Sequence, residues 1–91
     1  MVYSIKQSSA FKRALKSYQH DKKLLKELAF VVDELAQWKT LSTKYRNHKL
    51  QWDNAWLTEC HIRPDVLLIY YYEQSVLVLV LVDIGSHSDL F

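Results

Sequence analysis

The sequence has very little of the residues that punctuate or cross-link a chain: of its 91 residues, one is Gly, one is Pro and one is Cys. With Gly85 as its single glycine, the chain has no glycine-rich loop of the kind that cradles phosphates. The single Cys60 excludes an internal disulfide and favours a small buried thiol in a reducing compartment. No Cys/His spacing matches a structural zinc site, and no serine stands in a nucleophile-elbow motif.

A long apolar run and a secretion signal are absent as well. The longest apolar run, residues 76–82, is far shorter than the roughly 20 residues needed to span a bilayer. The first six residues contain no apolar signal core and no cleavage site. We therefore expect a cytoplasmic protein without a membrane partner. The length predicts a single domain over residues 1–91, with one modest core.

Charge is plentiful but unevenly distributed. Residues 1–49 contain 11 of the 12 Lys/Arg residues against four acids, a balance of +7, whereas residues 50–91 have a balance of −5. Composition alone fits solvated helix faces. It also fits a basic surface that meets a polyanion such as RNA.

The N-terminal half predicts one strand and two helices. Alternation from Val2 to Gln7 indicates a weak opening strand, after which Ser8 or Ser9 can cap a helix. Asp21 can cap a second helix, whose apolar stripe runs at helical spacing from Leu24 to Leu35. The lysines and arginines of residues 12–26 fall mostly between the apolar positions and should lie outside. From residue 39 to residue 54 the periodicity disappears, which predicts a polar, basic loop.

The C-terminal half predicts three sequential strands. Residues 56–62 alternate between two faces, and Arg63-Pro64 interrupts the strand because proline cannot donate to a ladder. Residues 66–72 are β-branched and aromatic, and the turn at residues 73–75 leads into residues 76–82. The last strand is apolar on both faces, so both should be covered. The order β-α-α-β-β-β predicts a two-layer α+β domain, in which a helix hairpin packs on a mostly antiparallel sheet.

Histidines and one carboxylate at the corners of these elements are the candidates for chemistry. His48 lies in the basic loop, His61 and Asp65 flank the Arg63-Pro64 corner, and His87 follows the last strand. If these side chains converge, they suit RNA cleavage: a ribose 2′-hydroxyl must lose a proton and the departing 5′-oxygen must gain one, and histidine can do either near neutral pH.

Three cations are candidates for phosphate and RNA binding: Arg46, Lys49 and Arg63 can stabilise charge on the phosphorane. Because the substrate supplies the nucleophile, no metal and no cofactor is needed. Other interpretations stay open. The histidines can be ordinary surface residues, or three of them with Asp65 can form a zinc site. Trp52 and Trp56 can stack on bases or simply pack.

Three blocks of the C-terminal half resemble the YafQ branch of the RelE/ParE superfamily of bacterial toxins. They are Tyr-Arg-Asn-His-Lys-Leu at residues 45–50, Glu-Cys-His-Ile-Arg-Pro-Asp followed by an apolar run at residues 59–70, and Ile-Gly-Ser-His-Ser-Asp-Leu-Phe at residues 84–91. The last two are specific. The N-terminal half fits only as a pattern of one strand and two basic helices.

The resemblance implies a RelE-like fold and a type II toxin-antitoxin toxin: a ribosome-dependent endoribonuclease that cuts mRNA and is silenced by a cognate antitoxin. By matched position it implies an active site of five residues. These are His48, His61, Asp65, His87 and Phe91. We expect His87 to lead proton transfer with Asp65 as its partner, His61 and His48 to orient the phosphate, and Phe91 to position a base. The basic helices would contact ribosomal RNA.

Some positions depart from the family pattern, and two alternatives follow. Trp52, Trp56 and Thr58 stand where the family often has glycine and a basic residue, and Asn47 replaces a common Asp. These departures bear on rate and codon preference more than on class. One alternative is a ParE-like toxin that acts on DNA gyrase without cutting RNA, and the other is a non-catalytic interaction module of the same fold.

Overall fold

The computed structural model describes residues 2–52 and 55–91, and the side chains of residues 51, 52, 55 and 56 lie outside the description. The strands are β1 (Ser4–Gln7), β2 (His48–Trp52), β3 (Ala55–Arg63), β4 (Val66–Glu73) and β5 (Val78–Gly85). The α-helices are α1 (Ser9–Leu15), α2 (Lys22–Ala36) and α3 (His87–Leu90). Three 3-10 turns, η1 (Lys16–Tyr18), η2 (Thr43–Tyr45) and η3 (Gln74–Val76), join them.

The two N-terminal helices begin at the residues that the sequence predicts. Ser8 accepts a hydrogen bond from the Phe11 amide and caps α1, and Asp21 accepts one from the Leu24 amide and caps α2. Each cap satisfies a backbone N–H that has no partner within its helix. The predicted apolar stripe of α2 faces inward, whereas the basic side chains of residues 12–26 are exposed. The prediction of a basic helix hairpin is confirmed.

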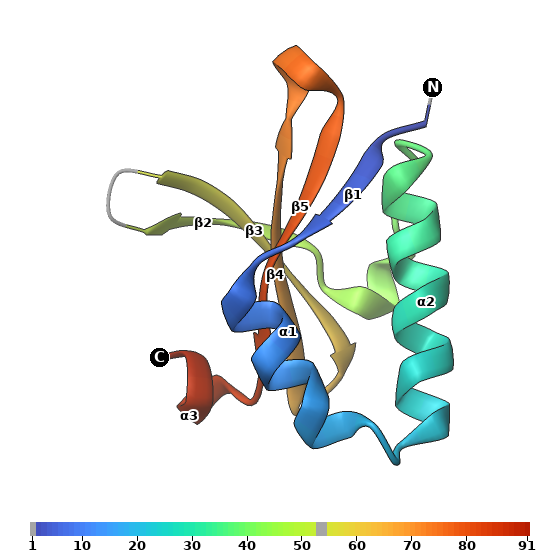
Figure 1. Ribbon diagram of the computed structural model, residues 1–91, viewed down its shortest axis with the longest axis vertical. Coiled ribbons are helices and arrows are strands. Elements are labelled where there is room, and N and C mark those ends of the chain that lie inside the picture. Colours follow the sequence, from blue (N-terminus) through green and yellow to red (C-terminus); the bar gives the residue numbers. More distant parts are fainter. Residues whose placement is uncertain (1, 53–54) are drawn as a thin grey trace.

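The strands form one five-stranded sheet in the order β1-β5-β4-β3-β2. Strands β2 to β5 pair antiparallel with their neighbours, while β1 pairs parallel to β5 at one edge. Helices α1 and α2 lie along one side of this sheet, and the β2–β3 hairpin extends away from α2 (Figure 1). The predicted two-layer α+β architecture is therefore found.

The core lies between the helices and one face of the sheet. Phe11 of α1 and Leu24, Leu28, Val31 and Leu35 of α2 pack against alternate residues of β3, β4 and β5. Cys60 belongs to this core, and burial raises the pKa of its thiol to about 12, with Glu59 adding to the shift. A thiol that ionises only at such a high pH packs in the core and does not act as a nucleophile near neutral pH. The expected buried cysteine is confirmed.

The structure differs from the predicted elements in two places. Residues 39–54, expected to form a loop, contain β2, which is an edge strand held by β3. Residues 87–90, to which no element was assigned, form α3. As for membranes, every helix of residues 2–52 and 55–91 is too short or too polar to cross a bilayer.

The two faces of the sheet have different roles, and strand register shows which residues share a face. Cys60, Leu68 and Ile84 stand side by side on β3, β4 and β5 and point to the core. One residue further, His61, Leu67 and Gly85 stand side by side and point to the opposite face, since side chains alternate along a strand. The candidate residues of β3 and of the end of β5 are therefore on the face without α1 and α2.

Candidate active site

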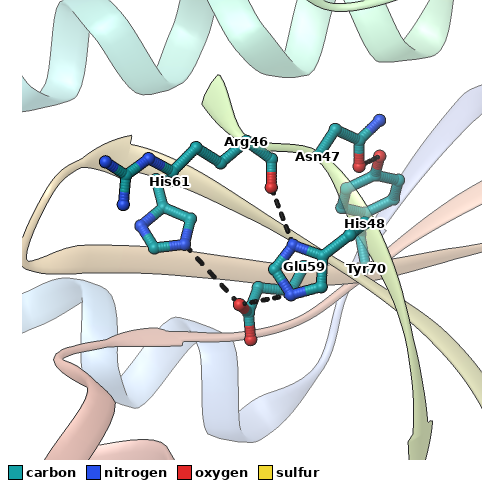
Figure 2. A network of polar contacts seen from close by, with 6 residues as sticks. All are labelled: Arg46, Asn47, His48, Glu59, His61 and Tyr70. Atoms are coloured by element: carbon teal, nitrogen blue, oxygen red, sulfur yellow. Dashed lines mark hydrogen bonds and ion pairs between the residues drawn. The ribbon is translucent and has the colours of Figure 1, made fainter. Parts of the chain in front are cut away.

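A buried carboxylate lies at the centre of the polar end of the sheet. Glu59 of β3 is only 5% exposed. Its Oε1 atom is 3.0 Å from His48 Nε2 and 3.6 Å from His61 Nε2, so both rings converge on one oxygen (Figure 2). The register explains the convergence: His48 of β2 pairs directly with Glu59, and His61 follows two residues later on the same face. We call these three side chains the Glu59 clamp.

The contacts of His48 involve both of its ring nitrogens. Its Nδ1 atom is 2.9 Å from the carbonyl oxygen of Arg46, which can only accept a hydrogen bond, so this contact needs the proton on Nδ1. Its Nε2 atom is 3.0 Å from Oε1 of Glu59, and a hydrogen bond there needs a further proton on either partner. The geometry therefore suits a proton shared between imidazole and carboxylate, and a group that holds such a proton can donate it.

His61 is less constrained than His48. Its distance to Glu59 Oε1, 3.6 Å, is long for a hydrogen bond. Its other ring nitrogen, Nδ1, is buried and has no hydrogen-bond partner in residues 2–52 and 55–91. The rings of His48 and His61 are 6.4 Å apart, measured between centroids. The clamp therefore fixes one imidazole at both nitrogens and holds the second through one long contact.

The three candidate cations have different surroundings. Arg46 adopts a left-handed backbone (φ 49°) that directs its carbonyl to His48, and its side chain extends toward His61 (Figure 2). Arg46, His61 and Arg63 line one pocket of about 230 Å³. Arg63, however, donates two hydrogen bonds to Asp21, at 2.7 and 3.0 Å. Lys49 follows His48 in β2, so it points to the other face of the sheet.

His87 is the first residue of the short helix α3, and Phe91 follows its last residue. Ser86 caps α3 in a capping box with Asp89, and the backbone N–H of Phe91 donates to the carbonyl of His87. The two rings lie 4.8 Å apart, measured between centroids. Gly85, the last residue of β5, is two strands from His61, because Leu67 of β4 lies between them. Two strand spacings put the backbone of Gly85 about 10 Å from that of His61.

Asp65 is exposed at the turn between β3 and β4. Burial raises the pKa of Tyr18, and the charges of Asp89 and Asp65 add to the shift. Within the described residues Asp65 has no hydrogen bond or ion pair with a histidine. Its expected partnership with His87 remains a prediction.

Five active-site candidates are predicted from the sequence, and the structure adds Glu59. His48, His61 and His87 come from three separate segments and lie at one end of the sheet, and Asp65 and Phe91 border the same end. Glu59 belongs to a block that matches the family, but no role is predicted for it. A signal is present in the sequence: in an alternating strand it shares a face with His61, and an acid on the face of a histidine is a candidate partner. The two alternatives for Trp52 and Trp56, stacking on bases or plain packing, concern side chains outside the described residues.

Fold and site together define a class of protein: a small α+β domain with a basic helix hairpin on one side and a histidine-rich sheet end on the other. The sequence matches the family described as a bacterial toxin of type II toxin-antitoxin system, YafQ, over residues 3–91. The chain therefore belongs to this family and is a type II toxin, as the three blocks of the C-terminal half predicted. No curated protein sequence matches the chain.

Solved structures support the same assignment. A metal-bound toxin from Helicobacter pylori is 38% identical over the whole of both chains, with a TM-score of 0.90. YafQ in the E. coli DinJ–YafQ complex is 27% identical over 98% of both chains, with a TM-score of 0.84. RelE of the Pyrococcus horikoshii RelE–RelB complex is 18% identical, with a TM-score of 0.74, and shows the shared fold. The expected RelE-like fold is confirmed.

The metal-bound relative raises the question whether this site fits a metal ion. In the described part of the chain, no group of three or more His, Cys, Asp or Glu side chains is arranged to hold one. The nitrogens of His48 and His61 face the carboxylate of Glu59 rather than a common centre. The arrangement does not fit a metal ion, and no step below involves one.

Proposed function

We propose that this toxin is a ribosome-dependent endoribonuclease that cleaves mRNA without a metal ion. The observation that supports the proposal is that histidines of three segments lie at one end of the sheet. His48 and His61 contact Glu59, and the backbone of Gly85, two residues before His87, is two strand spacings from that of His61. A phosphodiester bound between the Glu59 clamp and His87 would have one proton-transfer group near its attacking oxygen and another near its leaving oxygen. That is the arrangement that internal transesterification needs.

The chemistry follows from which group holds a proton. His87, in its neutral form, takes the proton of the ribose 2′-hydroxyl, and the 2′-oxygen forms a bond to the adjacent phosphorus. The bond to the 5′-oxygen breaks, and that oxygen takes the proton held by the His48–Glu59 pair. The products are a 2′,3′-cyclic phosphate and a free 5′-hydroxyl. His61 and Arg46 stabilise the charge on the phosphorane, and Phe91 positions a base.

The remaining candidates have supporting roles in this proposal. Asp65 orients His87 once RNA is bound. Lys49 contacts the RNA beyond the scissile phosphate. Arg63 is committed to Asp21, so we assign it to holding the β3–β4 corner rather than to phosphate binding. His48 is fixed at both ring nitrogens and therefore keeps its orientation before RNA arrives.

Two macromolecular partners and a compartment follow from the same proposal. The exposed cations of α1 and α2 form a basic surface suited to ribosomal RNA: Lys12, Arg13, Lys16, Lys22, Lys23 and Lys26. An antitoxin silences the toxin, as the E. coli DinJ–YafQ and P. horikoshii RelE–RelB complexes illustrate for those proteins. The protein acts in the cytoplasm, where translating ribosomes are found.

The test is inducible expression of the wild type and of His87→Ala in bacteria, followed by mapping of cut transcripts. We expect arrest of translation, with mRNA cut on ribosomes and 5′-hydroxyl ends at the cuts, and loss of both in the variant. His20→Ala is the matched control, because His20 is an exposed histidine that belongs to none of the three segments with candidate histidines. DNA damage signalling without cut RNA would instead support a gyrase poison, and normal growth would support an interaction module.

A further inference from the structure

A groove that no part of the proposed reaction uses begins at the candidate active site. It measures about 540 Å³ and runs between the end of α2, the start of β2 and the strands β3 and β4. Its lining includes Trp38, Asn47, His48, Lys49 and Thr58. His48 also belongs to the Glu59 clamp, whereas Lys49 next to it points to the other face of the sheet, so the groove and the clamp adjoin at the edge strand β2. A strand of RNA bound at the clamp can reach the groove by passing around this edge.

An aromatic side chain forms one wall of this groove. Trp38 follows α2 in a left-handed conformation (φ 63°) and is 52% exposed, a large value for a tryptophan. Its ring stacks on Tyr3 at 5.4 Å and meets the edge of Tyr72 at 4.5 Å, both measured between centroids. The indole is therefore held in place by packing while half of its surface stays open. A fixed, open indole is a stacking platform for a base.

Polar groups on the opposite wall complement a nucleotide. Lys49 is exposed and has no carboxylate partner in the described part of the chain, whereas nearby Lys39 is paired with Glu34 at 3.3 Å. Asn47 accepts a hydrogen bond from Tyr70 through its Oδ1 atom, which orients its amide group and leaves the NH₂ available. One free cation suits a phosphate, and one oriented amide suits the edge of a base.

We propose that this groove binds an unpaired nucleotide of the substrate RNA next to the cleaved phosphate, with the base on Trp38 and the phosphate on Lys49. The inference rests on the proposed nuclease function and extends it, because it assigns RNA contacts beyond the reacting groups. The positive charge at Lys49 and the position of His48 at the edge of the groove favour a nucleotide over an apolar protein segment. A longer RNA would then bind more tightly than a short one, because it can place an additional base on Trp38. Any base can stack in this way, so the gain would not depend on sequence.

Binding of short RNAs to the His87→Ala protein, which should not cut them, tests the proposal. Dinucleotides and oligomers lengthened at either end are titrated by fluorescence anisotropy. We expect extension at one end to tighten binding by about 5- to 100-fold, the range of one stacked base. Trp38→Ala should abolish this gain. Lys49→Gln should weaken the longer RNA and reduce the salt dependence of log Kd by about one unit per contact.

The controls separate the groove from the fold and from the function. Lys6→Gln removes an exposed strand lysine outside the groove and should leave both the gain and the salt slope unchanged. If the Trp38→Ala protein unfolds, the effect of Lys49→Gln on the salt dependence of log Kd alone decides whether the groove binds RNA. Equal affinity for short and long RNA, or a salt slope unaffected by Lys49→Gln, overturns the groove proposal while cutting by the wild type upholds the nuclease. Absence of both binding and cutting overturns both.

Discussion

The two halves of the candidate site are built in opposite ways. The Glu59 clamp is formed by paired strands, and its carboxylate is buried under two histidines. His87 begins a helix of four residues, Phe91 follows that helix, and both side chains are exposed. One half is fixed by strand pairing, whereas the other is held by a cap and a few local contacts.

This difference shows how one small domain can hold one reacting group in a fixed orientation and still let RNA enter beside another. The clamp cannot move without disturbing the sheet, so it presents its proton at a fixed place. Helix α3 can adjust to RNA at little cost, because short terminal elements open locally without unfolding the core. Substitutions in the clamp should therefore affect both activity and stability, whereas substitutions in α3 should affect activity alone.

The largest effect is expected from Glu59→Gln. The neutral amide can neither take up a proton nor carry the negative charge that faces the two histidines, so we expect RNA cleavage to fall by about 100-fold or more. Because buried polar groups lose a partner, the free energy of unfolding should fall by about 1–3 kcal/mol. Single-turnover cleavage and urea unfolding measure the two quantities.

Glu73→Gln is the control for this change. Glu73 is an exposed glutamate at the end of β4, and its side chain bonds only to Ser75 in the described residues, so cleavage and unfolding should both stay near the wild-type values. A Glu59→Gln protein of unchanged activity would contradict the idea that the clamp orients reacting groups. An inactive protein of unchanged stability would show that the clamp contributes to RNA cleavage but not to the free energy of unfolding.

The sequence predicted the fold well because local patterns and tertiary structure agree in most elements. The caps at Ser8 and Asp21 and the stripe of α2 are local signals, and both were found. Strand β2 was missed because a short edge strand rich in polar residues is held by its neighbour β3 rather than by its own propensity. Helix α3 carries a readable signal, the Ser-x-x-Asp capping box at residues 86–89.

The site was predicted less completely because its roles depend on contacts between distant residues. Arg63 was expected to bind phosphate, but its guanidinium pairs with Asp21, 42 positions away in the sequence. Lys49 neighbours His48 in the chain yet points to the other face of β2. Spacing alone reveals neither relation. The histidine positions were predicted from corner placement and family resemblance.

A smaller effect is expected from Ser86→Ala, which tests the adjustable half. The change removes the capping box of α3, which should cost about 1 kcal/mol of local helix stability. That cost lowers the population of well-placed His87 by at most about fivefold, so cleavage should fall by a similar factor. The melting temperature should not change, because α3 opens without the core.

The conservative Ser86→Thr variant should restore most of the activity, since threonine also caps helices. Ser17→Ala, at an exposed serine of η1 that bonds only to a nearby carbonyl, is the matched control. A clearly lower melting temperature in Ser86→Ala would contradict the proposed difference between the two halves of the site, because it would show that α3 unfolds together with the core.

The smallest effect on activity is expected from Asp21→Asn, which removes the ion pair with Arg63 but keeps the helix cap, as asparagine caps about as well as aspartate. The hydrogen bonds from Arg63, with the cap bond from Leu24, hold the pKa of Asp21 below its ordinary value. A lowered folded pKa means that the pair contributes stability above the unfolded value of about 3.9 and loses it as pH falls through the folded value.

The wild type should therefore melt at a higher temperature than Asp21→Asn at pH 5–7, and the two curves should converge as pH falls through the lowered folded pKa of Asp21. Asp33→Asn, which changes an α2 acid bonded to neutral Gln37, should show no such convergence. Cleavage should stay within about twofold of wild type in Asp21→Asn and in Arg63→Gln alike, because the pair is structural. A much larger loss in Arg63→Gln than in Asp21→Asn would mean that Arg63 leaves Asp21 to bind RNA, and the cation would then belong to the adjustable half of the site.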